Sequence, residues 1–217
     1  SNIKSVLTLA HELGHGVHAS LARTTQPFLT FDSPLTLAET ASVFGEMLVF
    51  HDIKNRLKKK EDKLALYMQK IEEIFATVFR QIAMYRFEQD FHKMRREKGE
   101  LAVTDINALW RKHQKAMFGD AVTLTADYDI WWSYISHFIH TPFYVYAYAF
   151  GELLTLSLYE MYLEQDNALT DRYLDLLKAG GSQSPHELLE PFGIDLNDRR
   201  FWENGIKLIE QLIEEAK

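Results

Sequence analysis

Two histidines four residues apart, His11 and His15, enclose a glutamate in the segment His-Glu-Leu-Gly-His. On an α-helix, side chains at positions i and i+4 project from the same face, so both imidazoles can reach one metal ion. Two imidazoles and a carboxylate suit Zn²⁺ and leave a fourth position for water. Glu12 lies at the edge of that face, where its carboxylate can take a proton from the water as the metal lowers the water's pKa. The spacing therefore predicts a hydrolytic zinc site, and the alternative interpretation is a helix with two structural histidines.

Such a site needs a third protein ligand, for which Glu39 is the first candidate. It lies 24 positions after His15, which is enough for one helix to end and a second helix to return alongside it. Asp32 is the alternative, but a ligand in a loop is harder to hold in place. Glu46 lies two turns beyond Glu39 and is either an acceptor for a ligand imidazole or a plain surface carboxylate. His18 is expected to support the site or the fold and not to bind the ion.

These side chains depend on helices for their positions, and the apolar pattern is helical along the chain. Apolar residues recur at spacings of three and four, whereas strand-like alternation is nearly absent. A further short helix is expected to begin at Ser184-Pro185, where a capping residue precedes a proline. The other expected helices cover residues 3–22, 35–57, 61–97, 104–118, 131–134, 143–163, 167–179 and 198–216. The sequence therefore predicts an all-α fold that carries the His-Glu-Leu-Gly-His motif on its first helix.

The composition limits the class of protein and its partners. A chain of 217 residues, 47% hydrophobic and 25% charged, is expected to form one globular domain over residues 1–217. Its net charge of −7 argues against nucleic acid as a partner. No run of 18 apolar residues is present, so no membrane partner is expected. The absence of cysteine excludes disulfides and fits a reducing compartment, so we expect a cytoplasmic location.

Four segments together resemble a known family. They are similar to the oligoendopeptidase F branch of the thimet-oligopeptidase-like zinc metallopeptidases, and the resemblance extends over essentially the whole chain. The first two motifs are specific when they occur together. The segments are His11-Glu12-Leu13-Gly14-His15, Ala38-Glu39-Thr40-Ala41-Ser42-Val43-Phe44-Gly45-Glu46, Phe143-Tyr144-Val145-Tyr146-Ala147-Tyr148-Ala149 and Leu177-Lys178-Ala179-Gly180-Gly181-Ser182.

The resemblance implies a zincin-like catalytic domain that hydrolyses internal peptide bonds of short, unstructured oligopeptides. It assigns one Zn²⁺ per chain to His11, His15 and Glu39. It makes Glu12 the general base, which also passes the proton to the leaving amine.

An aromatic-rich stretch receives a role from the same resemblance. Twelve of the 28 aromatic residues lie between residues 128 and 162, where an apolar core is the plain explanation for most of them. In the family, a histidine and tyrosines of this region stabilise the oxyanion that forms during peptide hydrolysis. The resemblance carries this role to His137, Tyr144 and Tyr148, with His140 as the alternative histidine.

Family members are much longer chains, so we expect these residues to form only the C-terminal catalytic portion. The missing N-terminal portion of the same polypeptide is then an expected partner. The alternative function is a zinc-binding helical fragment that is inactive without that portion. Di-iron carboxylate bundles also use Glu-x-x-His, which residues 12–15 match, but they need the unit twice. None of the 18 glutamates supplies a second one.

Overall fold

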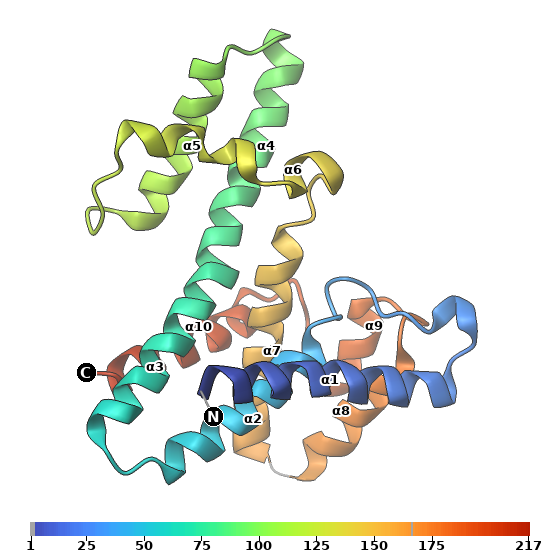
Figure 1. The fold of residues 1–217 in the computed structure, drawn as a ribbon. Coiled ribbons are helices and arrows are strands. Elements are labelled where there is room, and N and C mark those ends of the chain that lie inside the picture. The colour runs from blue at the N-terminus through green and yellow to red at the C-terminus, as the bar shows by residue number, and fades with distance from the viewer. Residues whose placement is uncertain (1–2, 166) are drawn as a thin grey trace. The chain divides into compact units, whose positions relative to one another are not determined.

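The computed structural model describes residues 3–165 and 167–217 (Figure 1). Within these residues the regular structure is helical and contains no strand, so the all-α prediction is confirmed. None of the described helices is long and apolar enough to cross a membrane. The chain divides into two compact units. The single domain expected over residues 1–217 stays a prediction.

The first unit comprises the described residues up to Ile74 together with Phe150–Lys217. Within it, α1 packs against α2 and α8, and α3 packs against α10 (Figure 1). Its elements are α1 (Ile3–Thr25), η1 (Phe28–Thr30), α2 (Thr40–Arg56), α3 (Lys60–Ile74), most of α7 (Tyr146–Gln165), α8 (Asn167–Ala179), α9 (Pro185–Leu189), η4 (Glu190–Phe192) and α10 (Arg199–Glu215).

The second unit comprises Phe75–Ala149. Its core is a cluster of six buried apolar residues, Met84, Phe87, Leu109, Trp110, Ile135 and Val145. Its elements are the π-helical segment η2 (Phe75–Phe79), α4 (Arg80–Lys98), α5 (Val103–Phe118), η3 (Ala126–Tyr134), α6 (His137–His140) and the first turn of α7.

Two helices begin at least three residues later than expected. The helix expected from residue 35 begins at Thr40, because residues 35–39 form turns that include a bond from the Leu37 N–H to the Pro34 carbonyl. The helix expected from residue 143 begins at Tyr146. Phe143 has a positive φ of 60°, and its N–H donates to Glu88 Oε1 at 2.8 Å. A residue in that conformation cannot continue a right-handed helix.

The buried and exposed faces of α1 are separated along its length. The buried face consists of Leu7, Ala10, Gly14, His18 and Ala22. The exposed side chains include four large apolar ones, which are Val6 at 37%, Leu9 at 58%, Leu13 at 61% and Val17 at 50% exposure. The helix that carries the motif therefore presents apolar side chains to solvent as well as to the core of its own unit.

Gly14 permits a very close approach of α1 to α2. A Cβ at Gly14 would collide with the backbone of α2, at the Ala41 carbonyl oxygen and, at 2.7 Å, at the Ala41 carbonyl carbon. A backbone neighbour cannot swing aside as a flexible side chain can. The glycine in the middle of the motif therefore sets the distance between the two helices that carry the candidate ligands.

We expect Gly14→Ala to lower the free energy of unfolding by about 3 kcal/mol, the upper end of the usual cost of overpacking. Urea denaturation followed by circular dichroism measures this effect. Gly16→Ala is the matched control, because a Cβ at Gly16 meets no atom within 4 Å. This control is expected to raise stability by up to about 1 kcal/mol through helix propensity. Equal stability of the two variants would contradict the close approach.

Candidate metal centre

The first unit brings together His11, His15 and Glu39. Both histidines lie on α1, and Glu39 is the N-cap residue of α2. Glu39 Oε2 lies 3.3 Å from His11 Nε2 and 3.5 Å from His15 Nε2. Within the described part of the chain, this is the one group of three or more His, Cys, Asp or Glu residues whose potential ligand atoms all lie within 4.8 Å of one another.

The separations of these atoms fit a tetrahedral zinc site. Ligand atoms about 2.0–2.1 Å from one tetrahedral ion are about 3.3 Å apart. The two nitrogen-to-oxygen distances, 3.3 and 3.5 Å, are close to that edge length. All three side chains are partly buried, so an ion held by them would also be open to solvent on one side. The donor set of two imidazoles and a carboxylate therefore suits zinc chemically and geometrically.

Glu39 is held in place by its own helix start. Ser42, which is fully buried, donates its hydroxyl to Glu39 Oε2 at 2.8 Å. Gly151 on α7 lies against the stem of Glu39, since a Cβ at Gly151 would come within 3.5 Å of the Glu39 Cβ. The hydrogen bond from His11, helped by the one from Ser42, lowers the pKa of Glu39 against the opposing effect of burial. The candidate third ligand is therefore an anion at neutral pH.

Glu46 supports the imidazole of His11 from the other side of the ring. Its Oε2 lies 3.4 Å from His11 Nδ1, and the residue is buried. The interpretation of Glu46 as a plain surface carboxylate is therefore wrong. Hydrogen bonds to Glu39 and then to Glu46 raise the pKa of His11 to about 10. A metal ion at Nε2 would displace the proton that this raised pKa keeps on His11, so zinc binding would release a proton.

Glu12, His18 and Asp32 lie on or near α1 but are not part of the ligand group. Glu12 is exposed on α1 directly after His11. His18 is buried, and burial lowers its pKa, so it is a neutral imidazole inside the unit. Asp32 is exposed in the loop after η1 and is outside the ligand group.

The second unit brings together His137, Tyr144 and Tyr148. Tyr148 Oη lies 3.4 Å from His137 Nε2. The ring of His137 stacks on Tyr144 and meets Tyr148 edge-on, each at a centroid distance of 5.9 Å. The two tyrosine rings are 5.0 Å apart. His137 is thus the histidine that contacts both tyrosines, whereas His140 is exposed at the end of α6. This group and the candidate metal ligands lie in different units.

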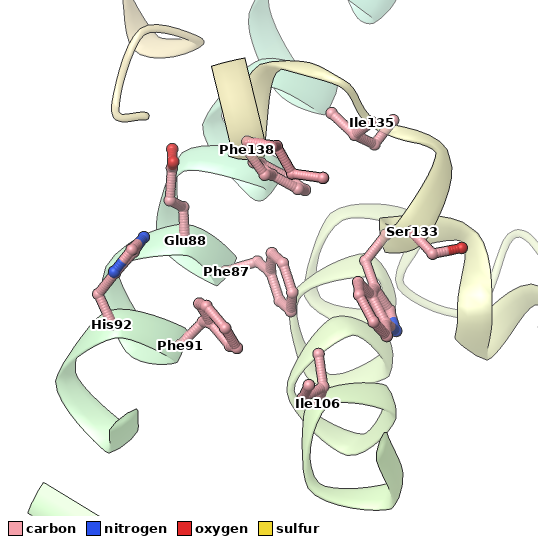
Figure 2. Close-up of a pocket in the computed structure, with 10 residues that line it drawn as sticks. Phe87, Glu88, Phe91, His92, Ile106, Ser133, Ile135 and Phe138 are labelled. Atoms are coloured by element: carbon pink, nitrogen blue, oxygen red, sulfur yellow. The ribbon is translucent and has the colours of Figure 1, made fainter. Parts of the chain in front are cut away.

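A cavity of about 120 Å³ also lies within the second unit (Figure 2). Aromatic and aliphatic side chains of α4, α5, η3 and α6 line most of it, and Glu88 and His92 add polar groups at the α4 side. Burial raises the pKa of Glu88, while the hydrogen bond from the Phe143 N–H opposes this shift. The cavity is large enough for a single small apolar group.

Three residues around the candidate metal centre belong to no pattern that gives them a role from the sequence. Ser42 follows Glu39 by three residues, and Lys70 and Glu152 lie on other helices. Lys70 did carry a signal, because it is four residues after Leu66 and four before Ile74, which are both buried. A lysine at that period occupies the buried face of its helix, so it needs an anionic partner.

Comparisons with known proteins find peptidases that are similar over nearly the whole chain. A model of peptidase family M3 matches residues 2–208. The chain is 31% identical to oligopeptidase PepF of Bacillus subtilis (strain 168), over 100% of this chain and 32% of the relative. It is 29% identical to the chromosomal oligoendopeptidase F of Lactococcus lactis subsp. cremoris, over 99% and 36%.

A solved structure is similar as well. The crystal structure of oligoendopeptidase-F from Enterococcus faecium superposes with a TM-score of 0.85 at 26% identity, over 99% of this chain and 39% of that one. The chain thus spans about a third of the length of the curated relatives it matches.

Proposed function

We propose, because the chain belongs to peptidase family M3, that it is the zinc-binding catalytic portion of a metalloendopeptidase. M3 peptidases are zinc metallopeptidases in general. The proposed reaction is hydrolysis of internal peptide bonds in short, unstructured oligopeptides. The observation that carries the proposal is the convergence of His11, His15 and Glu39 from two helices onto one point.

In the proposed centre, one zinc ion is bound by His11, His15 and Glu39. When bound, zinc supplies a Lewis acid that lowers the pKa of water and polarises a carbonyl group. The carboxylate of Glu12 accepts the proton of the attacking water and passes it to the leaving amine. Its exposure beside His11 supports this role, because the reacting water has to reach it from solvent.

His137, Tyr144 and Tyr148 are the proposed donors to the oxyanion. An imidazole N–H and two phenol hydroxyls can all donate hydrogen bonds to a developing negative charge. Their mutual contacts in the second unit support a common role, since three such groups gathered at one point can act on one oxygen. The contacts of His137 with both tyrosines also favour it over His140.

The proposed partner within the same polypeptide is an N-terminal portion that precedes these residues. Two observations support it. The chain spans about a third of its curated relatives, and α1 exposes Leu9, Leu13 and Val17 on the helix that carries the ligands. Covering such a face removes apolar surface from water. The second candidate function follows from this, namely a zinc-binding helical unit without activity until the other portion is supplied. Oligopeptide substrates and a cytoplasmic location belong to the same proposal.

The proposal is tested by Glu39→Ala. We expect zinc affinity to fall by more than the roughly 10–100-fold that loss of a supporting hydrogen bond costs, because one of three protein ligands is removed. Competition against a chromophoric chelator gives the affinity. Asp32→Ala is the matched control, since it removes the rival carboxylate from the loop and should leave the affinity unchanged. Zinc loss in the control together with full affinity in Glu39→Ala would reverse the assignment.

A further inference from the structure

A buried lysine lies behind the proposed metal centre. Lys70 on α3 is only 2% exposed. Its Nζ lies 2.7 Å from Glu46 Oε1 and 3.7 Å from Glu152 Oε1. Both carboxylates are buried as well, Glu46 on α2 and Glu152 on α7. Three helices of the first unit therefore place ionisable groups at one point that is withdrawn from water, where burial raises the pKa of Glu152.

The charge state of this group follows from its partners. Burial alone would lower the pKa of Lys70, but the negative charges of Glu152 and Glu46 raise it above its ordinary value. Lys70 is therefore a cation. Taking such a charge out of water is costly, and ion pairing repays that cost only where the geometry is excellent. Apolar side chains of similar volume often stabilise a fold equally well, so stability alone is a poor reason for this arrangement.

The two oxygens of Glu46 face different partners. Oε1 accepts a hydrogen bond from Lys70 Nζ, and Oε2 lies 3.4 Å from His11 Nδ1. The opposite ring nitrogen of His11, Nε2, faces Glu39 Oε2 in the ligand group. A continuous path of polar contacts thus runs from Lys70 through Glu46 to the imidazole of His11. With Oε1 held by the lysine, the Glu46 carboxylate cannot rotate freely about its last bond.

We propose that Lys70 is a positioning residue of the metal centre, which fixes the Glu46 carboxylate and thereby orients His11 with Nε2 toward the ion. The inference rests on the proposed zinc function. Hydrogen bonds behind ligand imidazoles set their tautomer and direction, and loss of such a bond usually costs 10–100-fold in metal affinity. Here the supporting carboxylate has its own support, which comes from a third helix. Metal affinity should therefore depend on a residue that does not touch the ligands.

The test is a double-mutant cycle on zinc affinity in the full 217-residue chain, with wild type, Glu46→Gln, Lys70→Met and the double variant. Each single variant is expected to bind zinc about 10-fold more weakly. Because Lys70 acts through Glu46, the double variant should be no weaker than the Glu46→Gln variant. Independent effects would multiply to about 100-fold in the double variant, and that result would overturn the proposal. Unchanged affinity in Lys70→Met would overturn it too.

The cycle stays decisive if Lys70→Met leaves little folded protein. In that variant Glu46 and Glu152 remain buried near each other without the lysine cation. The double variant removes both the cation and the charge of Glu46. Replacing both partners of a buried pair is usually tolerated. In that case the double variant is compared with Glu46→Gln alone. Equal affinities support the proposal, and a further 10-fold loss contradicts it.

A second readout follows the orientation of His11 directly. In ¹H–¹⁵N spectra of the imidazoles, the Nδ1–H proton of His11 should be protected from exchange in the wild type and unprotected in Lys70→Met. Lys54→Met is the matched control, because Lys54 also joins two helices through an ion pair, with Glu215 at 2.7 Å, but outside the metal centre. It should change neither the Nδ1–H signal nor the zinc affinity. A protected proton in Lys70→Met would contradict the positioning role.

The two proposals can fail separately. If the wild-type chain bound no zinc, the proposed function would be wrong, and Lys70 would then be judged by the Nδ1–H signal alone. If the wild type bound zinc and the cycle was additive, the zinc function would stand and the role of Lys70 would fall.

Discussion

The His11→Ala, His15→Ala double variant is expected to retain no zinc after dialysis, whereas the wild-type chain should hold about one ion per chain. The variant removes two of the three proposed ligands and leaves Glu39 as a single, partly buried carboxylate donor. Both imidazoles are partly exposed, and alanine favours the helix, so α1 should remain folded. Metal content by mass spectrometry measures the result, with helical content by circular dichroism as the check on folding.

A His51→Ala, His186→Ala double variant is the matched control for this experiment. Both residues lie in the first unit, and neither belongs to the ligand group. The control should keep its zinc. Stoichiometric zinc in the variant that lacks His11 and His15 would refute the assignment. About two irons per chain in the wild type would refute it differently, in favour of a di-iron centre.

The second large effect is expected for Glu12→Gln, in a polypeptide that also carries the N-terminal portion. Hydrolysis of a quenched fluorescent peptide should fall by about 10²–10⁴-fold, the usual contribution of a positioned acid–base group. Glutamine keeps the size of the side chain but cannot accept the proton. Zinc content should be unchanged, because Glu12 is not in the ligand group. Glu61→Gln on α3 is the control and should keep full activity.

The same assay separates the two candidate functions. The 217 residues alone are expected to bind zinc but to cleave the peptide weakly or not at all. Brisk cleavage by this chain alone, lost in Glu12→Gln, would show that the N-terminal portion is not needed. Loss of zinc in Glu12→Gln would instead show that this carboxylate is part of the ligand set and not a base.

The helices were predictable because their apolar period is regular, but the starts of α2 and α7 were not. Glu39 was expected inside a helix that starts at residue 35. It is instead the N-cap of α2, after a series of turns that begins near Pro34. This position helps to fix the candidate ligand. A residue in the first turn of the helix can hydrogen-bond to the side chain of the cap residue, and here the Ser42 hydroxyl donates to the Glu39 carboxylate. Local chemistry of this kind competes with the helical period.

The convergence of the two candidate ligands His11 and His15 was predictable because a spacing of four fixes two side chains on one face of a helix. The contacts among Lys70, Glu46 and Glu152 were not predictable, because they depend on the packing of α2, α3 and α7. Periodicity places Lys70 on a buried face but cannot say which carboxylates it meets. The contacts of His137 with the two tyrosines also depend on tertiary packing, so the sequence alone left His137 and His140 as alternatives.

The backbone at Phe143 has a consequence for the segment that leads to Tyr144. A bulky residue with positive φ costs about 1–3 kcal/mol and persists only where its surroundings determine it. Here the carboxylate of Glu88, from a helix far back in the chain, holds the Phe143 N–H. The segment is thus ordered by folding itself. Its conformational entropy is lost before any ligand arrives, so binding at the proposed position of Tyr144 need not supply the free energy to order the segment.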